Sequence, residues 1–111
     1  MKLVKITIYI NEADKWQHRP LDLELMNLLD EHGIIGGTVL RAVAGFTYHQ
    51  PVETTTLVDV NSRLPLVVQF IDSEKKVAAV LPLLKSMIGD RLMIRQPVDV
   101  LNGKLPASPV S

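Results

Sequence analysis

The first residues of the chain alternate between apolar and polar side chains, and this pattern predicts a strand over residues 3–10. One face carries β-branched apolar residues (Val4, Ile6, Ile8, Ile10), and the other carries polar or mixed ones (Lys5, Thr7, Tyr9). A period of two is typical of a strand with one buried face. Residues 64–71 are apolar except for Gln69, so we expect both faces of that strand to be covered. Helices in so short a chain cover one face of a sheet, and the other face is expected to meet another subunit.

Two segments carry apolar residues at helical spacing. The first follows Pro20, which suits the first turn of a helix, and it ends before Gly33, the expected C-terminal cap. Its apolar stripe consists of Leu21, Leu25, Leu28 and Leu29. The second begins at the N-cap pair Asp72-Ser73 and ends at Gly89-Asp90. Its stripe consists of Val77, Val80, Leu81, Leu84, Met87 and Ile88. Pro82 lies inside this helix and is expected to kink or restart it, because its ring removes a backbone donor.

Two more strands complete the pattern. Residues 38–44 are rich in β-branched side chains and close at Gly45, after the pair Gly36-Gly37. Residues 92–100 contain Pro97, which marks an edge strand or a bulge. The resulting order β-α-β-β-α-β predicts an α+β fold of the ferredoxin-like, split-βαβ type, with an antiparallel sheet and two helices on one of its faces.

The connection over residues 45–63 is long for a loop in so small a domain. Within it, residues 54–60 are rich in β-branched side chains and strand-like. We expect this connection to form an arm that projects from the sheet and pairs in part with the end of the second strand.

Composition narrows the class of protein. A chain of 111 residues fits one domain, which we place at residues 1–100, followed by a C-terminal tail at residues 101–111. Lys plus Arg and Asp plus Glu each number 12, so the net charge is zero and binding to nucleic acid is not expected. Cysteine is absent, which excludes disulfides and thiolate metal sites. No leader segment or bilayer-length apolar run is recognisable, so we expect no membrane insertion and a cytoplasmic location.

Candidate chemistry is sparse. The sequence contains no nucleophile elbow and no P-loop, so no catalytic residue is predicted and an enzyme is not expected. His18 and His49, together with Glu12 or Asp14, leave open a metal site formed across chains. His32 is instead expected to end the first helix, where its partial positive charge suits the dipole.

Trp16, the only tryptophan, lies in a charged loop, and two interpretations of it stay open. In the first, the ring anchors the loop over the start of the first helix, while Asp14 accepts hydrogen bonds from nearby backbone amides. In the second, the ring stacks on a planar ligand while Lys15 or Arg19 holds an anion.

Two segments resemble those of a known family. Residues 37–46 (Gly-Thr-Val-Leu-Arg-Ala-Val-Ala-Gly-Phe) resemble the stretch that leads into the long T-loop of PII signalling proteins, and Ile88-Gly89-Asp90-Arg91 resembles their B-loop. The fuller similarity is to a PII-like family known as domain of unknown function 190. It is carried by Tyr9-Ile10, Asp14-Lys15-Trp16, Arg19-Pro20-Leu21, residues 36–46, Leu64-Pro65, Ile71-Asp72, Leu81-Pro82 and Met87-Ile88-Gly89.

This resemblance implies an assembly and a ligand site. It implies a homotrimer with a small anionic ligand held in clefts between subunits, and adenine nucleotides (ATP, ADP or AMP) are the candidate ligands. In PII proteins, movement of the T-loop reports the bound ligand to a partner protein, and residues 47–63 correspond to that loop. The implied site residues are Gly37, Thr38, Gly45 and Phe46 at the T-loop base, Gly89, Asp90 and Arg91 in the B-loop, and Arg95 on the fourth strand.

Three other functions stay open. The chain is an interaction module if residues 47–63 dock on a transporter or an enzyme without any ligand. It is a metal-binding trimer if it resembles CutA proteins in function. It is a small ferredoxin-like enzyme if His49 or Tyr48 acts as an acid or a base.

Overall fold

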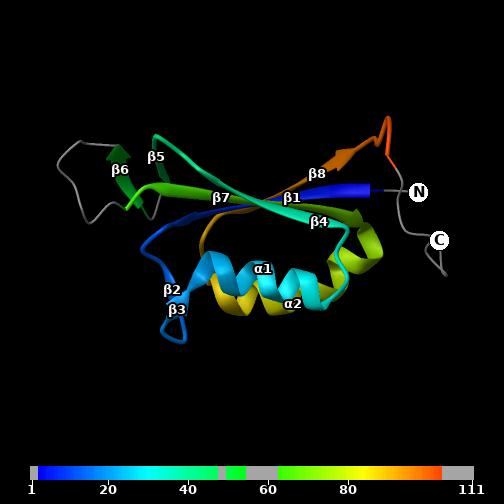
Figure 1. Cartoon of the computed structure of the whole chain (residues 1–111), viewed down its shortest axis with the longest axis horizontal. Coiled ribbons are helices and arrows are strands. Elements are labelled where there is room, and N and C mark those ends of the chain that lie inside the picture. Colours follow the sequence, from blue (N-terminus) through cyan, green and yellow to red (C-terminus); the bar gives the residue numbers. More distant parts are fainter. Residues whose placement is uncertain (1–2, 48–49, 55–62, 104–111) are drawn as a thin grey trace.

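The computed structural model describes residues 3–47, 50–54 and 63–103 of the chain. Its helices are α1 (Leu21–Glu31) and α2 (Glu74–Ile88). Its strands are β1 (Leu3–Asn11), β2 (Lys15–Trp16), β3 (Arg19–Pro20), β4 (Gly36–Arg41), β5 (Ala44–Thr47), β6 (Gln50–Thr54), β7 (Pro65–Ser73) and β8 (Met93–Val98). Strands β4, β7, β1 and β8 form one antiparallel sheet in that order, and β2–β3 and β5–β6 form small two-stranded sheets beside it (Figure 1).

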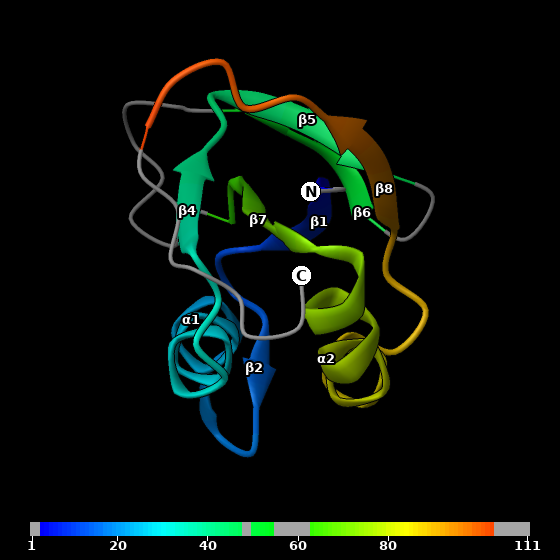
Figure 2. The same cartoon turned by 90° about the vertical axis from the view of Figure 1, so that its right-hand side faces the viewer.

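Both helices lie on the same side of the four-stranded sheet (Figure 2). β1 and β7 are its central strands, and β4 and β8 are its edges. This arrangement confirms the predicted ferredoxin-like α+β fold. Pro97 lies in β8, so the expectation of an edge strand is confirmed as well. An edge tolerates proline because the missing donor can face outward.

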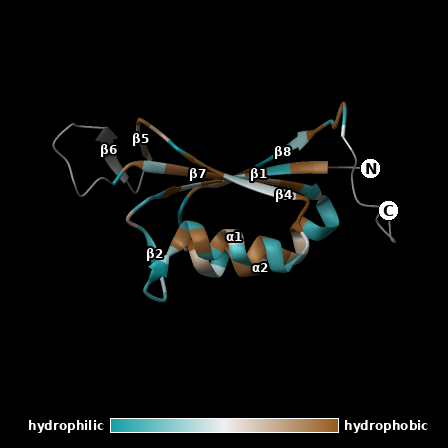
Figure 3. Cartoon of the chain, in the orientation of Figure 1, coloured by the Kyte–Doolittle hydropathy of each residue, from teal (hydrophilic) through white to brown (hydrophobic). Residues whose placement is uncertain are grey.

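The hydrophobic core forms between the sheet and the helices. It combines alternate residues of β1 and β7 with one stripe of each helix: Ile6, Ile8, Ile10, Leu66, Val68, Phe70, Leu21, Leu25, Leu29, Val77, Val80 and Leu84. Both helices carry hydrophobic and hydrophilic residues along their length, as amphipathic surface helices do (Figure 3). The apolar periodicity of the sequence therefore identifies the buried faces correctly.

The ends of the helices follow the predicted caps. Ser73 Oγ accepts a hydrogen bond from the backbone N–H of Lys76 at 3.2 Å, which caps the start of α2. His32 is the C-cap of α1, with its Nδ1 2.9 Å from the Leu28 carbonyl, and Gly33 follows with φ +68°. In the described ranges, neither helix combines the length and the apolar character needed to span a bilayer.

Pro82 does not restart the second helix. α2 runs as a single segment across this residue. Pro82 and Ala78, the residue whose carbonyl would accept the missing hydrogen bond, are both exposed, so water can reach that carbonyl. Of the two expected outcomes, the restart is therefore wrong, and the kink stays a prediction.

The strand predicted at residues 38–44 is β4 in the structure, and its bounds differ from the predicted ones. It begins at Gly36, which pairs with Ile71, and it ends at Arg41 rather than at Ala44. Ala44 belongs to β5, where it pairs with Thr54 of β6. The chain leaves the sheet because β7 itself starts only at Pro65 and offers no further partner. The expected arm is confirmed where it is described, as the β5–β6 hairpin; residues 55–60 lie outside the described residues.

The face of the sheet opposite the helices is partly open in the single chain. On β7, Leu66, Val68 and Phe70 are buried against the helices, whereas Val67 and Ile71 on the other face are half-buried. Coverage of this second face by another subunit stays a prediction.

Candidate ligand-binding site

Two of the predicted site residues, Gly37 and Arg95, lie on opposite edges of the sheet. Gly37 of β4 pairs with Phe70, Phe70 pairs with Ile6, and Ile6 pairs with Arg95 of β8, so these residues form one row across the sheet. Neighbouring strands are about 4.8 Å apart, which separates the two edges by roughly 14 Å within one chain. Directly opposite residues share a face, so Gly37 and Arg95 are both on the helix side.

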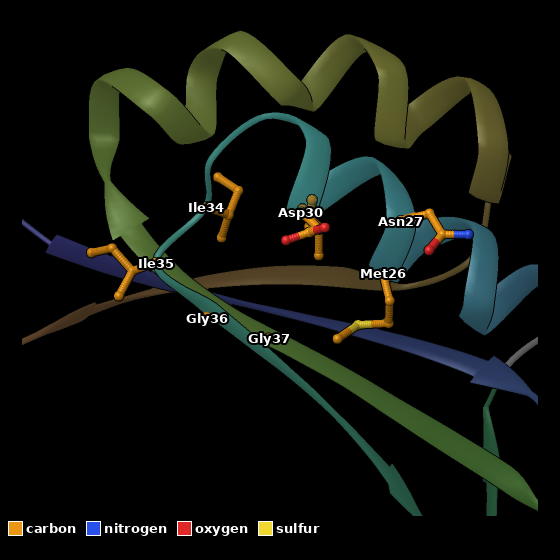
Figure 4. Close-up of a pocket in the computed structure, with 8 residues that line it drawn as sticks. Met26, Asn27, Asp30, Ile34, Ile35, Gly36 and Gly37 are labelled. Atoms are coloured by element: carbon orange, nitrogen blue, oxygen red, sulfur yellow. The ribbon is translucent and has the colours of Figure 1, made fainter. Parts of the chain in front are cut away.

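The start of β4 lies between two hollows. On the helix side, Gly37 borders a groove of about 380 Å³ whose other residues include Met26, Asn27, Asp30 and Ile34 (Figure 4). A Cβ at Gly37 would come within 2.9 Å of Met26 Cε, so a larger residue there would have to displace the end of the Met26 side chain. Thr38 lies on the opposite face of the strand, in a second groove of about 400 Å³, which Lys5, Gln69, Ile71 and Val100 also line.

The base of the arm forms a small apolar pocket. Gly45 and Phe46 of β5 line it together with Tyr9, Pro65 and Val67, and its volume is about 150 Å³. The Phe46 ring is exposed, as are the side chains of two other apolar residues of the arm region, Val43 and Val52. A Cβ on Gly45 would lie 3.2 Å from Pro65 Cγ, so this glycine allows β5 to approach the first residue of β7.

Arg95 lies on the β8 edge in a cationic setting. It borders a shallow groove of about 240 Å³ with Lys85 and Leu81 of α2. Two cationic side chains beside an open sheet edge favour an anionic ligand or partner at this edge.

The turn after α2 holds Gly89, Asp90 and Arg91. Arg91 is not a free surface cation: its Nε donates to Asp14 Oδ2 at 2.9 Å and its Nη1 donates to the Ile88 carbonyl at 3.0 Å. The second bond satisfies a carbonyl at the C-terminal end of the helix. Among the described residues, no hydrogen bond of Nη2 is found.

Sequence reasoning identified Arg91 but missed its partner. Asp14 was predicted to accept from local backbone amides, and it does accept from the Asn11 N–H at 2.9 Å. The same oxygen also accepts from Arg91, 77 positions away in sequence. No local pattern signals such a pair, although both residues belong to segments that carry the family resemblance.

The position of Trp16 agrees with the first of its two interpretations, in which the ring anchors the loop, and stacking on a ligand stays a prediction. Trp16 is partly buried and packs against the hydrophobic core. His18 lies at the exposed tip of the β2–β3 hairpin, and His49 lies outside the described residues. The part of the chain that the structure describes holds no group of three His, Asp or Glu side chains suited to a metal ion.

Gly89 is expected to be indispensable to the turn. Its φ of +62° and ψ of −129° place it in a region that L side chains rarely adopt. We expect Gly89→Ala to lower the free energy of unfolding by about 1–3 kcal/mol, measured by urea denaturation at fixed protein concentration. Gly36→Ala is the matched control, because Gly36 has no positive φ and an added Cβ meets nothing within 4 Å. An equal loss in both variants would contradict this prediction.

Comparison with known proteins places the chain in a family. The profile of the DUF190 family, described as "Uncharacterized ACR", matches residues 3–100. A UPF0166 protein of Aquifex aeolicus is 32% identical over 80 residues, which are 69% of this chain and 76% of the relative. A UPF0166 protein of Methanocaldococcus jannaschii is 27% identical over 89 residues, which are 80% of this chain and 82% of the relative.

Solved structures show the same fold. The structure of CPII from Thiomonas intermedia bound to ADP and bicarbonate matches with a TM-score of 0.65 and 19% identity, over 90% of this chain and 89% of that chain. A structure of CPII, a nitrogen regulatory PII-like protein, bound to ADP, AMP and bicarbonate matches with a TM-score of 0.60 over the same shares and at the same identity. The chain therefore belongs to the DUF190 family, and its fold is that of the PII-like proteins.

Proposed function

We propose that this chain is a regulatory protein that forms a homotrimer and binds a small anionic ligand, an adenine nucleotide, in the clefts between its subunits. One observation carries the proposal: the site residues Gly37 and Arg95 occupy opposite edges of the sheet, in the same row. A closed ring of three copies brings the β4 edge of one copy beside the β8 edge of the next. The residues that one chain keeps apart are then neighbours across a subunit boundary.

The chemistry of the two edges fits the halves of a nucleotide. The groove beside Gly37 is lined by Met26 and Ile34, apolar side chains that suit a flat base. The opposite edge supplies the cations Arg95 and Lys85, which suit phosphate oxygens. ADP and AMP are bound by the CPII structures that share this fold, which supports nucleotides as the first ligands to test.

The proposal is tested by measuring assembly and binding together. Light scattering after size-exclusion chromatography is expected to give three times the monomer mass. Titration calorimetry with ATP, ADP, AMP and cyclic dinucleotides is expected to give saturable heat for at least one of them. We expect Arg95→Ala to weaken this binding by about tenfold or more, the loss of a charge-assisted contact.

The control variant is Arg19→Ala. Arg19 is an exposed arginine whose Nη1 lies 3.5 Å from Glu24 Oε1, and it is not one of the proposed site residues. This variant is expected to bind like the parent chain. A monomeric protein would count against the proposal. So would a trimer that gives no heat of binding with any nucleotide, if its Arg91→Ala variant gives none either.

A second function is favoured by a separate observation. Val43, Phe46 and Val52 are exposed apolar side chains in the arm region, and contact with another protein would remove them from water. In that case the arm docks on a partner with no ligand involved. Removing residues 44–54 is then expected to preserve the assembly while abolishing capture of the partner, and unchanged capture would exclude this function.

A further inference from the structure

A turn between β1 and β2 connects three parts of the chain that are far apart in sequence. We call it the 11–14 turn: Asn11, Glu12, Ala13 and Asp14. It is closed by three hydrogen bonds of its own, each 2.9 Å long: Asp14 N–H to the Asn11 carbonyl, Asn11 N–H to Asp14 Oδ2, and Ala13 N–H to Asn11 Oδ1. Side chains of Asn and Asp that bond nearby amides in this way stiffen a turn.

The 11–14 turn holds both ends of the segment that carries the β5–β6 hairpin. Glu12 Oε2 binds Nε of Arg41, the last residue of β4, at 3.0 Å. Glu12 Oε1 accepts from the Leu64 N–H at 2.9 Å, and the Glu12 N–H donates to the Leu64 carbonyl at 3.0 Å. Asn11 Nδ2 donates to the Arg63 carbonyl. The 11–14 turn therefore contacts the chain both where it leaves the sheet toward the hairpin and where it returns to the sheet.

The same turn also holds the residue expected to meet the ligand. Asp14 Oδ2 accepts from Arg91 Nε at 2.9 Å, and this oxygen also accepts from the Asn11 N–H. The Asp14 and Arg91 side chains are only 13% and 28% exposed. Because the pair is largely shielded from water, moving Arg91 away would leave Asp14 poorly compensated and disturb the bond that closes the turn.

We infer that the 11–14 turn couples the position of the Arg91 guanidinium to both ends of the hairpin, with Asp14 as the positioning residue. An anion that binds Arg91 weakens its hydrogen bond to Asp14. The 11–14 turn then loosens, and so do its contacts with Arg41 and Leu64. Only its ligand rests on the proposed function. A ligand changes an equilibrium by its differential affinity for the two arrangements, and such couplings typically amount to about 5- to 150-fold.

The coupling is tested without any ligand, by amide hydrogen exchange of the full chain. The reporters are the Leu64 N–H, which donates to Glu12, and the Ala42 N–H, which donates to the Pro65 carbonyl at 2.9 Å. Arg91→Ala is expected to speed their exchange by about fivefold or more. Asp14→Asn is expected to do the same, and the double variant to be no faster than the faster single one.

A control at the other end of the sheet separates coupling from general loosening. Lys76→Ala removes an ion pair with Asp72 of 3.6 Å, and it is expected to leave exchange at Ala42 and Leu64 unchanged. Arg91→Lys, which keeps the charge, guards against a variant that fails to fold, and it is expected to fall between the parent and Arg91→Ala. Unchanged exchange in Arg91→Ala, or equal acceleration in Lys76→Ala, would overturn the inference.

Adding ADP to the parent chain separates this inference from the proposed function. If calorimetry shows that ADP binds and exchange at Leu64 and Ala42 rises, both stand. If ADP binds and exchange at these amides does not change, the inference fails while the ligand proposal stands. If ADP does not bind but Arg91→Ala speeds the exchange, the coupling stands and the choice of ligand is wrong.

Discussion

Phe70→Ala is expected to lower the free energy of unfolding by about 3–5 kcal/mol, the range measured for removing a large side chain from a packed core. Phe70 is 1% exposed and is among the largest fully buried side chains of the described residues. It lies in the central strand β7, between Gly37 on one side and Ile6 on the other. The substitution leaves a cavity beneath the row of residues that leads to both proposed ligand edges. Urea denaturation at fixed protein concentration measures the loss.

The chain contains its own control, because its only other phenylalanine is Phe46. That ring is 71% exposed, so Phe46→Ala is expected to change the stability of a single chain by less than about 0.5 kcal/mol. If an assembly buries the ring, the loss for Phe46→Ala is instead expected to be larger at high protein concentration and to shrink as the protein is diluted. Equal losses for both variants at all concentrations would contradict the assignment of Phe70 to the core.

The fold was predictable because its signals are local and repeated. The alternation in residues 3–10 places Ile6, Ile8 and Ile10 on the buried face, and these residues are buried. The cap at Ser73 and the glycine after His32 mark the beginning of one helix and the end of the other. Such signals involve residues within a few positions of one another, so the sequence contains all of the relevant information.

The misplaced end of β4 and the missed partner of Asp14 occurred where distant residues decide the outcome. Nothing near Ala44 says that β4 must stop at Arg41, because the reason is the starting point of β7 more than twenty residues later. The pairing of Asp14 with Arg91 is of the same kind. The buried face of a strand can be inferred from periodicity, whereas contacts between turns depend on where the completed fold places them.

Different kinds of contact hold the two ends of the sheet. At one end, the 11–14 turn fastens the arm and the turn after α2 by exposed or half-buried polar contacts. At the other end, the buried carboxylate of Asp72 fastens the start of β4 to the start of α2. The first set of contacts joins elements that are far apart in sequence, and the second set holds the edge that lines the proposed site.

Asp72→Ala is expected to lower the free energy of unfolding by about 2–4 kcal/mol, because it leaves two part-buried backbone donors without their acceptor. Asp72 is 3% exposed. Its Oδ2 accepts from the Ile35 N–H at 2.9 Å, and its Oδ1 accepts from the Ser73 N–H at 2.6 Å. Ile35 lines both grooves at the start of β4, so we also expect this variant to weaken nucleotide binding. Urea denaturation and calorimetry measure the two effects.

Two further variants decide which interaction of Asp72 matters. The ion pair with Lys76 is 3.6 Å long, and the lysine side chain is 46% exposed, so Lys76→Ala is expected to cost at most about 1 kcal/mol. Asp72→Asn keeps one acceptor oxygen and loses the other, so its loss is expected to be intermediate. Lys76 Nζ also donates to the Gly33 carbonyl, so if Lys76→Ala cost as much as Asp72→Ala, the two contacts of the lysine together would be the main source of the stability. The smaller loss expected for lysine assigns that role to the backbone hydrogen bonds, which fix the β4 edge independently of surface charge and salt.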